Sequence, residues 1–173
     1  MNTHFPSENT AKNAVKVWSL AKAIHVAFLT VKAASSEEPA TAAAGFDARP
    51  MRALFEENAD AIWFIVPRAF PALRTVDALL TFSNGPDGNH VAFYGTTSRV
   101  DDPVKLKSLW TAHADIAFPK GSTDGDATLL KFEPAKASFW AGGSDTLSFV
   151  INFLEAKMTG EAPEVGKHGF VPQ

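Results

Sequence analysis

The sequence has no cysteine among its 173 residues, and several other features are missing as well. Without cysteine there is no disulfide, thiolate metal ligand or cysteine nucleophile. A membrane-spanning helix needs an apolar run of about 18 residues, and none is present. Residues 1–13 also lack the apolar segment of a signal peptide. These absences predict a cytoplasmic protein that does not enter a membrane.

Basic runs and recognisable catalytic spacings are missing too. The 16 Lys and Arg residues are outnumbered by 19 Asp and Glu residues, and no basic run of five exists, which argues against nucleic acid as a partner. The five histidines are scattered and show no metal-ligand spacing, so no metal site is expected. A Gly-x-Ser-x-Gly elbow is also absent, which gives no support to a serine hydrolase.

The composition is that of a folded globular protein. Hydrophobic residues make up 46% of the chain and charged residues 20%, and the length suits one domain. We expect this domain to span residues 14–160. A flexible N-terminus, residues 1–13, and a loosely held tail, residues 161–173, are expected to flank it.

Apolar residues recur at three- and four-residue spacing in three places, which predicts three helices. The first covers Asn13–Ile24. The second begins after Asp101-Asp102-Pro103, where a carboxylate and a proline suit a helix start, and is expected to end near His113. The third begins at Ser144-Asp145 and is stopped by Gly160.

Short β-rich segments separated by turn residues predict six or seven strands. Ala61–Val66 is a continuous apolar run closed by Pro67, as in a strand buried on both faces. Tight turns join most of the strands, which favours an antiparallel barrel decorated by helices. Two hairpins are expected, the second of them around the turn Asn84–Asn89. The remaining predicted strands are Val26–Val31, Ala40–Phe46, Leu79–Ser83, His90–Val100, Ala127–Phe132 and Ala137–Trp140.

A few side chains suggest a binding site. Arg49 follows the second predicted strand beside Pro50, where a stiffened bend would hold its guanidinium for a phosphate, although a surface salt bridge is the alternative. Arg68 and Arg74 come just after the buried strand and would be able to converge with Arg49 on one anion. Trp63 and Trp110 would either flank a planar ring or fill the core.

The order of motifs from Val15 to Met158 resembles one family, the general stress protein branch of the pyridoxamine 5′-phosphate oxidase-like FMN-binding split barrels. Each motif is short, and the resemblance rests on their order and spacing together. The matching segments are Val17-Trp18, Ala48-Arg49-Pro50-Met51, Trp63-Phe64, Tyr94-Gly95-Thr96, Leu109-Trp110, Phe118-Pro119, Leu129-Leu130 and Phe139-Trp140.

This resemblance implies a mainly β (α+β) fold, a six-stranded antiparallel split β-barrel with flanking helices. It also implies a homodimer with two FMN molecules at the subunit interface. The residues it carries over as candidate cofactor contacts are Arg49, Pro50, Met51, Trp63 and Phe64, with Trp110 approaching from the second subunit.

One departure from the family pattern concerns the cofactor phosphate. Relatives grip it with a Ser-x-Lys motif, whereas this chain reads Val66–Arg74 at that place and has no lysine from Arg52 to Phe82. A phosphate grip would then fall to Arg49 with Arg68 or Arg74. Two functions stay open. One is an FMN-binding protein of stress-response type, with flavin-dependent oxidoreductase activity on an unknown substrate as an option. The other is a non-catalytic dimeric split barrel that has lost FMN and binds another ligand or a protein partner.

Overall fold

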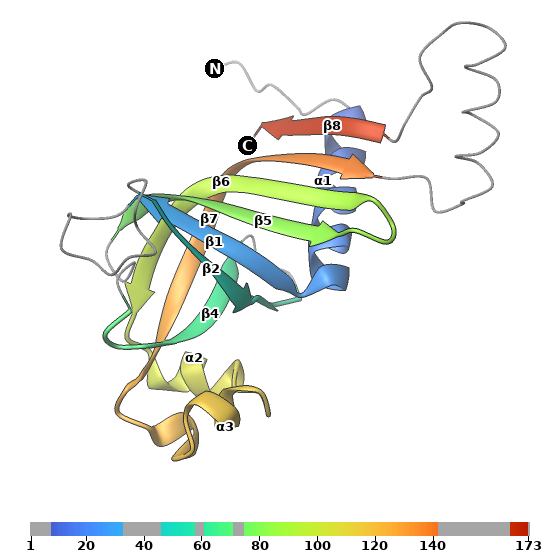
Figure 1. Cartoon of the computed structure of the whole chain (residues 1–173). Coiled ribbons are helices and arrows are strands. Elements are labelled where there is room, and N and C mark those ends of the chain that lie inside the picture. Colours follow the sequence, from blue (N-terminus) through green and yellow to red (C-terminus); the bar gives the residue numbers. More distant parts are fainter. Residues whose placement is uncertain (1–7, 33–45, 58–60, 71–74, 142–166, 173) are drawn as a thin grey trace, which may run out of the picture.

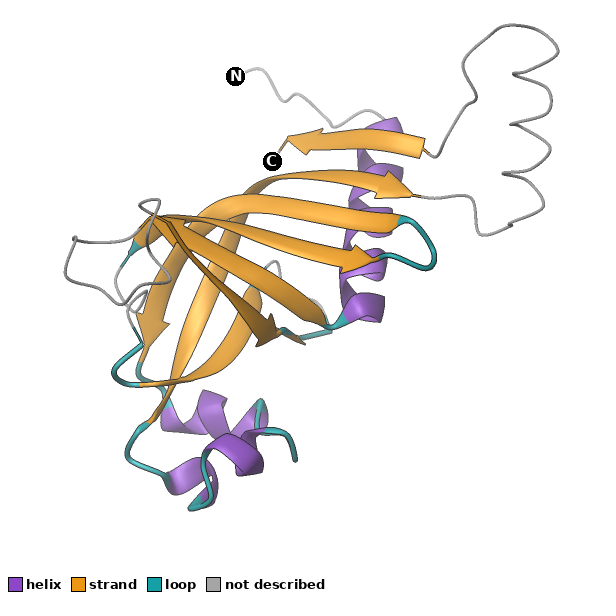
Figure 2. Cartoon of the chain, viewed as in Figure 1, coloured by secondary structure: helices purple, strands orange, loops and turns teal. Residues whose placement is uncertain are grey.

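The structure is a computed structural model, and it describes residues 8–32, 46–57, 61–70, 75–141 and 167–172. Strands make up most of this part of the chain, with helices packed around them (Figure 2). The elements in chain order are α1 Glu8–Ile24, β1 Val26–Lys32, β2 Phe46–Arg52, β3 Leu54–Phe55, β4 Ile62–Pro67, β5 Val76–Asn84, β6 Asn89–Val100, α2 Pro103–Ser108, α3 Ala114–Ala117, the 3₁₀ turn η2 Gly121–Thr123, β7 Ala127–Ala141 and β8 Lys167–Pro172.

The strands form one antiparallel sheet in the order β2-β1-β5-β6-β7-β4-β3, with β8 also paired to β7. The sheet curls into a split barrel, as Figure 1 shows. This confirms the predicted fold class. The structure has more strands than the six expected, because β3, with two residues, and β8 are additional.

The second predicted hairpin is present, whereas the first differs from the prediction in its partner strand. β5 and β6 pair from Val76↔Thr97 to Asn84↔Asn89, as the turn residues between them indicated. β1 pairs with β2, but β2 begins at Phe46, where the predicted partner strand was to end. Residues 40–45 of that predicted strand lie outside the described part of the chain. Arg49 therefore lies within β2, and not at a bend after a strand.

The two strands predicted at the end of the domain are a single strand, β7, of 15 residues. Its pairing with β6 shifts between Tyr94↔Lys136 and Gly95↔Pro134, which leaves Ala135 as the extra residue of a β-bulge. A bulge breaks the alternation of buried and exposed side chains. For this reason the sequence pattern resembled two separate strands.

Helix α1 covers the inner face of the sheet. Val17 and Ala21 are buried against inward-facing residues of β1, β5 and β6, and the Trp18 ring lies 5.3 Å from that of Phe93. The helix begins at Glu8, earlier than the Asn13 expected. It ends at Ile24, as predicted, because His25 takes a left-handed backbone conformation with φ of 63° and turns the chain into β1.

The helical segment after β6 is shorter than predicted. Asp102 caps α2 by accepting hydrogen bonds from the backbone amides of Val104 and Lys105, each 2.9 Å long. α2 ends at Ser108, and a turn separates it from the short α3, so one helix reaching His113 is a wrong prediction. The helix predicted for residues 144–160 lies outside the described residues.

The tail is described only over Lys167–Pro172, where the sequence predicted no strand and the structure places β8 on β7. Its partner segment is Lys136–Ala141, beyond the bulge, whereas β4 pairs with Ala127–Phe132 of β7. No helix within the described ranges is long and apolar enough to cross a bilayer.

Candidate functional site

Arg49 lies on β2 with its guanidinium held on two sides. Its Nε donates a 2.7 Å hydrogen bond to Oδ2 of Asp47, two residues earlier on the same face of the strand. Its guanidinium carbon lies 5.3 Å from the ring centroid of Phe70, within cation–π range. The side chain remains 37% exposed. In the described part of the chain, nothing accepts a hydrogen bond from its two Nη groups.

Arg49 borders a cavity of about 270 Å³. Strands β2 and β4 lie near opposite ends of the strand order, and both contribute to its walls, so the cavity forms where the barrel is split. The connection from α2 through α3 supplies the remaining wall. The lining residues are Arg49, Pro50, Met51, Arg52, Leu54, Ile65, Val66, Pro67, Phe70, Thr111, His113, Ala114, Ala117 and Phe118.

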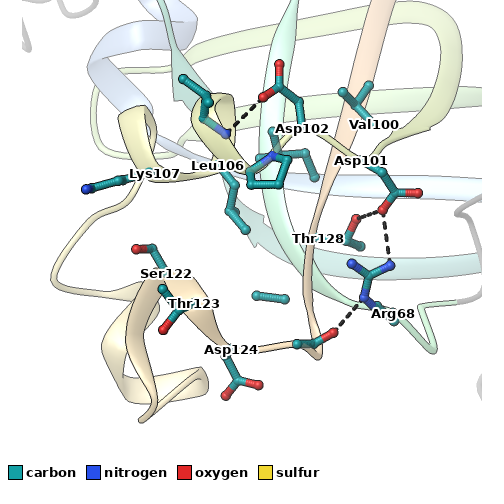
Figure 3. A pocket seen from close by; sticks show the side chains of 15 residues that line it. Arg68, Val100, Asp101, Asp102, Leu106, Lys107, Ser122, Thr123, Asp124 and Thr128 are labelled. Atoms are coloured by element: carbon teal, nitrogen blue, oxygen red, sulfur yellow. Dashed lines mark hydrogen bonds and ion pairs between the residues drawn. The ribbon is translucent and has the colours of Figure 1, made fainter.

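The short connection after β4 sends its side chains in two directions. A turn closed by a 2.9 Å hydrogen bond from the Phe70 amide to the Pro67 carbonyl brings Phe70 to Arg49. Arg68 goes to a different cavity, where its Nε donates to the Gly125 carbonyl at 2.6 Å and its Nη1 to Asp101 at 3.1 Å (Figure 3). The structure thus does not bring Arg68 to Arg49. Arg74 lies outside the described residues.

Asp101 is the centre of the cluster that holds Arg68. Its Oδ1 accepts from Arg99 at 2.8 Å, from Thr128 at 3.2 Å and from Arg68. The hydrogen bond from Arg99 lowers the pKa of Asp101 below its ordinary value, and the Thr128 hydroxyl and the charges of Arg99 and Arg68 add to this effect, while desolvation opposes it. The carboxylate is thereby kept ionised in the folded state to a lower pH than in the unfolded chain.

This shift predicts an acid dependence. A lowered folded-state pKa contributes stability that is present above the unfolded value of 3.8 and is lost as the pH falls through the folded value. We expect Asp101→Asn to lower the melting temperature slightly at pH 7, because the cluster is exposed. The difference from wild type should shrink below pH 3.8. Thermal unfolding at pH 7 and pH 3 measures this, and a difference that grows in acid would contradict it.

The cavity beside Arg68 is the larger of the two, at about 630 Å³. Its floor is apolar, with Leu106 and Leu129 buried. Its acidic groups are engaged within the chain, since Asp101 binds the two arginines and Asp102 caps α2. The smaller cavity is lined by Arg49, whose Nη groups bond to no acceptor among the described residues, and it is therefore the better candidate site.

None of the predicted aromatic residues lines that cavity in this chain, and the contact expected of Trp110 is with a second subunit. Phe64 is fully buried in the core, and Trp63 is only 7% exposed in a second apolar cluster, with the ammonium groups of Lys105 and Lys131 over its ring at 4.8 and 6.0 Å. Trp110 bonds to Asp115 through its Nε1 at 2.8 Å and packs near Phe118. Of the seven predicted residues that the structure describes, Arg49, Pro50 and Met51 line the cavity.

Eleven of the fourteen lining residues had not been predicted as site residues, among them Phe70, Thr111 and His113. To predict Phe70 at the cavity, one would have to know that a turn follows Pro67. Thr111 and His113 reach the cavity because α2 stops at Ser108 and the chain turns there. No Gly, Pro, Asn or Asp stands at positions 109–112, so the sequence carries no local signal for that turn.

A family model, described as pyridoxamine 5′-phosphate oxidase like, matches residues 12–164, which is most of the chain and includes both strands that flank the cavity. The chain belongs to this family. This match confirms the family that the order of the sequence motifs indicated. No curated protein matches the sequence.

Solved structures share the fold of this pyridoxamine 5′-phosphate oxidase-like chain. A general stress protein 26 from Jannaschia sp. CCS1 is 23% identical, with a TM-score of 0.74 over 94% of this chain and 99% of that one. A general stress FMN/FAD binding protein from Xanthomonas citri is 21% identical, with a TM-score of 0.63 over 75% and 89%. A pyridoxamine 5′-phosphate oxidase from Listeria innocua is 15% identical, with a TM-score of 0.52 over 71% and 94%.

Proposed function

We propose that this chain is an FMN-binding protein of stress-response type, and that it works as a flavin-dependent oxidoreductase. The observation that carries the proposal is Arg49, which lines a cavity with its guanidinium held by Asp47 and Phe70, while no described residue accepts a hydrogen bond from its Nη groups. Two parallel N–H groups are the donors that suit a phosphate. The FMN/FAD binding relative from Xanthomonas citri, with the same fold, supports the same choice of ligand.

The residues around the cavity fit one end of a flavin mononucleotide. Arg49 provides the phosphate contact, while Met51, Phe70 and Phe118 give apolar walls. Complete small-molecule sites usually measure about 300–1,000 Å³, so a cavity of about 270 Å³ holds part of the cofactor. When bound, the flavin supplies hydride chemistry. The chain's own part is to anchor the phosphate and to shield one side of the ligand from water.

A site that one chain encloses only in part suggests a homodimer, with the second copy completing it. Large apolar side chains are exposed on the outer face of the sheet, and the strand register places them on the same side. Phe28 is 51% exposed there, although such residues are usually buried. The large apolar residues exposed on this outer face are Val26, Phe28, Phe46, Tyr94 and Trp140.

The outer face gives a prediction about assembly. We expect the protein to elute at twice its mass of 18.6 kDa, and Phe28→Asp to weaken the dimer about thirtyfold or more, because a charge would be buried at the interface. Light scattering after gel filtration measures both. Val15→Asp is the control, since Val15 is also exposed but lies on α1, which packs on the inner face. A wild-type monomer, or equal loss in both variants, would contradict the prediction.

A visible absorption spectrum tests the proposed function. The purified chain is incubated with FMN, desalted and compared with a sample to which no FMN was added. Flavin absorption retained in proportion to protein supports binding, and screening of electron donors would then address catalysis. A colourless protein that takes up no FMN at tens of micromolar refutes the proposal.

One observation favours the second candidate, a non-catalytic dimer that has lost FMN. Phe70 lies over the guanidinium of Arg49, and Arg68 is engaged with Asp101 instead of the cavity. If Phe70 closes the phosphate position, the chain binds another ligand or a protein partner through the same barrel. The same spectrum separates the two candidates.

A further inference from the structure

Asp47 is a buried carboxylate with one hydrogen-bond donor. The residue is 4% exposed, and its Oδ2 accepts from Arg49. Its other oxygen, Oδ1, is buried, and no described residue donates a hydrogen bond to it. A buried charge that is only half satisfied costs stability. Its presence at this place therefore indicates a role other than holding the fold together.

The geometry shows what Asp47 does to Arg49. Both residues project to the inner side of β2, since their partners Val31 and Leu29 on β1 are buried. The bond to Asp47 fixes the Nε edge of the guanidinium, and the Phe70 ring fixes its plane. Arg49 lines the cavity with its guanidinium held by these two contacts, so little side-chain freedom remains to be lost on binding.

We propose that Asp47 is a positioning residue, which holds the Arg49 guanidinium for the terminal phosphate of a phosphate monoester. The identity of the monoester as FMN rests on the proposed function. The role makes a distinctive prediction because the charge of Asp47 opposes that of a phosphate. If only charge mattered, any removal of the carboxylate would tighten binding. If position matters, removal of the acceptor weakens binding, and a neutral acceptor restores it.

The experiment compares Asp47→Ala and Asp47→Asn in the full chain. FMN and riboflavin are titrated separately, with flavin fluorescence as the readout. We expect Asp47→Ala to weaken FMN binding about tenfold, and Asp47→Asn, whose amide oxygen can accept from Nε, to restore it to within about twofold of wild type. Riboflavin lacks the phosphate, so its affinity should not follow these changes. FMN binding that is unchanged or tighter in Asp47→Ala overturns the proposal.

A second readout separates this proposal from the proposed function. The Nε–H signal of Arg49 is followed by nuclear magnetic resonance while inorganic phosphate is added. We expect a shift in wild type that is absent in Asp47→Ala. If the wild type shows the shift but fails to bind FMN, the proposed function fails and the role of Asp47 stands. If phosphate leaves the wild-type signal unmoved, the role of Asp47 is refuted, whatever flavin does.

A further variant covers the case in which Asp47→Ala does not fold. Asp47→Glu keeps the charge but adds a methylene, which moves the carboxylate away from Nε of Arg49. We expect a loss of FMN affinity of about tenfold here too, and an unchanged affinity would overturn the proposal. In an Arg49→Lys background, which has no Nε, replacing Asp47 should cause no additional loss.

Discussion

Arg49→Ala is expected to lower the affinity for FMN about a hundredfold. A hydrogen bond to a charged group contributes about 1.5–3 kcal/mol, and two such bonds from the Nη groups account for a change of this size. The same replacement leaves the buried Asp47 without its donor, so the protein should also become less stable. Titration with FMN gives the affinity, and urea unfolding of the same samples reports the stability.

Arg68→Ala is the matched control for this variant, because it removes the same side chain from the adjoining cavity. Arg68 is bound to Asp101 and Gly125, so we expect FMN affinity to stay within about twofold of wild type. An equal loss in both variants would show that Arg68 reaches the phosphate when FMN binds. No loss in Arg49→Ala would remove the phosphate anchor on which the proposed function depends.

Gly95→Ala is expected to destabilise the fold by about 3 kcal/mol or more. A Cβ at this position would lie 2.0 Å from the carbonyl oxygen of Glu133 and 2.9 Å from Cα of Pro134, both of them backbone atoms of β7. No side chain can move to relieve this contact. Strands β6 and β7 form the longest pairing in the sheet, and they would have to separate at the bulge.

Thermal unfolding measures the effect of Gly95→Ala. For a domain of this size about 2–4 °C is lost per kcal/mol, so we expect the melting temperature to fall by roughly 6–12 °C. Gly85→Ala is the control, since nothing lies within 4 Å of a Cβ there, and its stability should stay within about 1 kcal/mol of wild type. A Gly95→Ala protein as stable as this control would mean that the strands part easily at the bulge.

Much of the fold follows from local patterns in the sequence. The apolar run Ala61–Val66 reads directly as β4, and the turn residues Asn84–Asn89 read as the hairpin of β5 and β6. The bulge at Ala135 does not, because an extra residue that shifts the alternation resembles the end of one strand and the start of another. The position of the shift depends on how β7 pairs with β6, which the sequence of β7 alone does not show.

The candidate site was harder to predict than the fold. Arg49 was singled out because it stands beside Pro50, although it lies within β2 and not at the bend that the proline suggested. The destinations of Arg68 and Phe70 depend on a turn after Pro67 that places one on each side of the chain, and a sequence pattern does not state which way each side chain goes. His113 lines the cavity only because α2 ends at Ser108, and the sequence does not state where that helix ends.

The pairing of β4 with β7 also determines when the cavity can form during folding. The hairpin of β5 and β6 joins neighbouring segments, whereas β4 pairs Ile62 with Phe132 and Pro67 with Ala127, contacts that close long loops. Sheets that depend on such distant contacts fold slowly, because the entropy of closing the loop is lost before the contacts form. Arg49 and the end of β4 face one cavity only after that closure. A ligand that binds there would therefore bind only the chain in which β4 is already paired, and would stabilise that pairing.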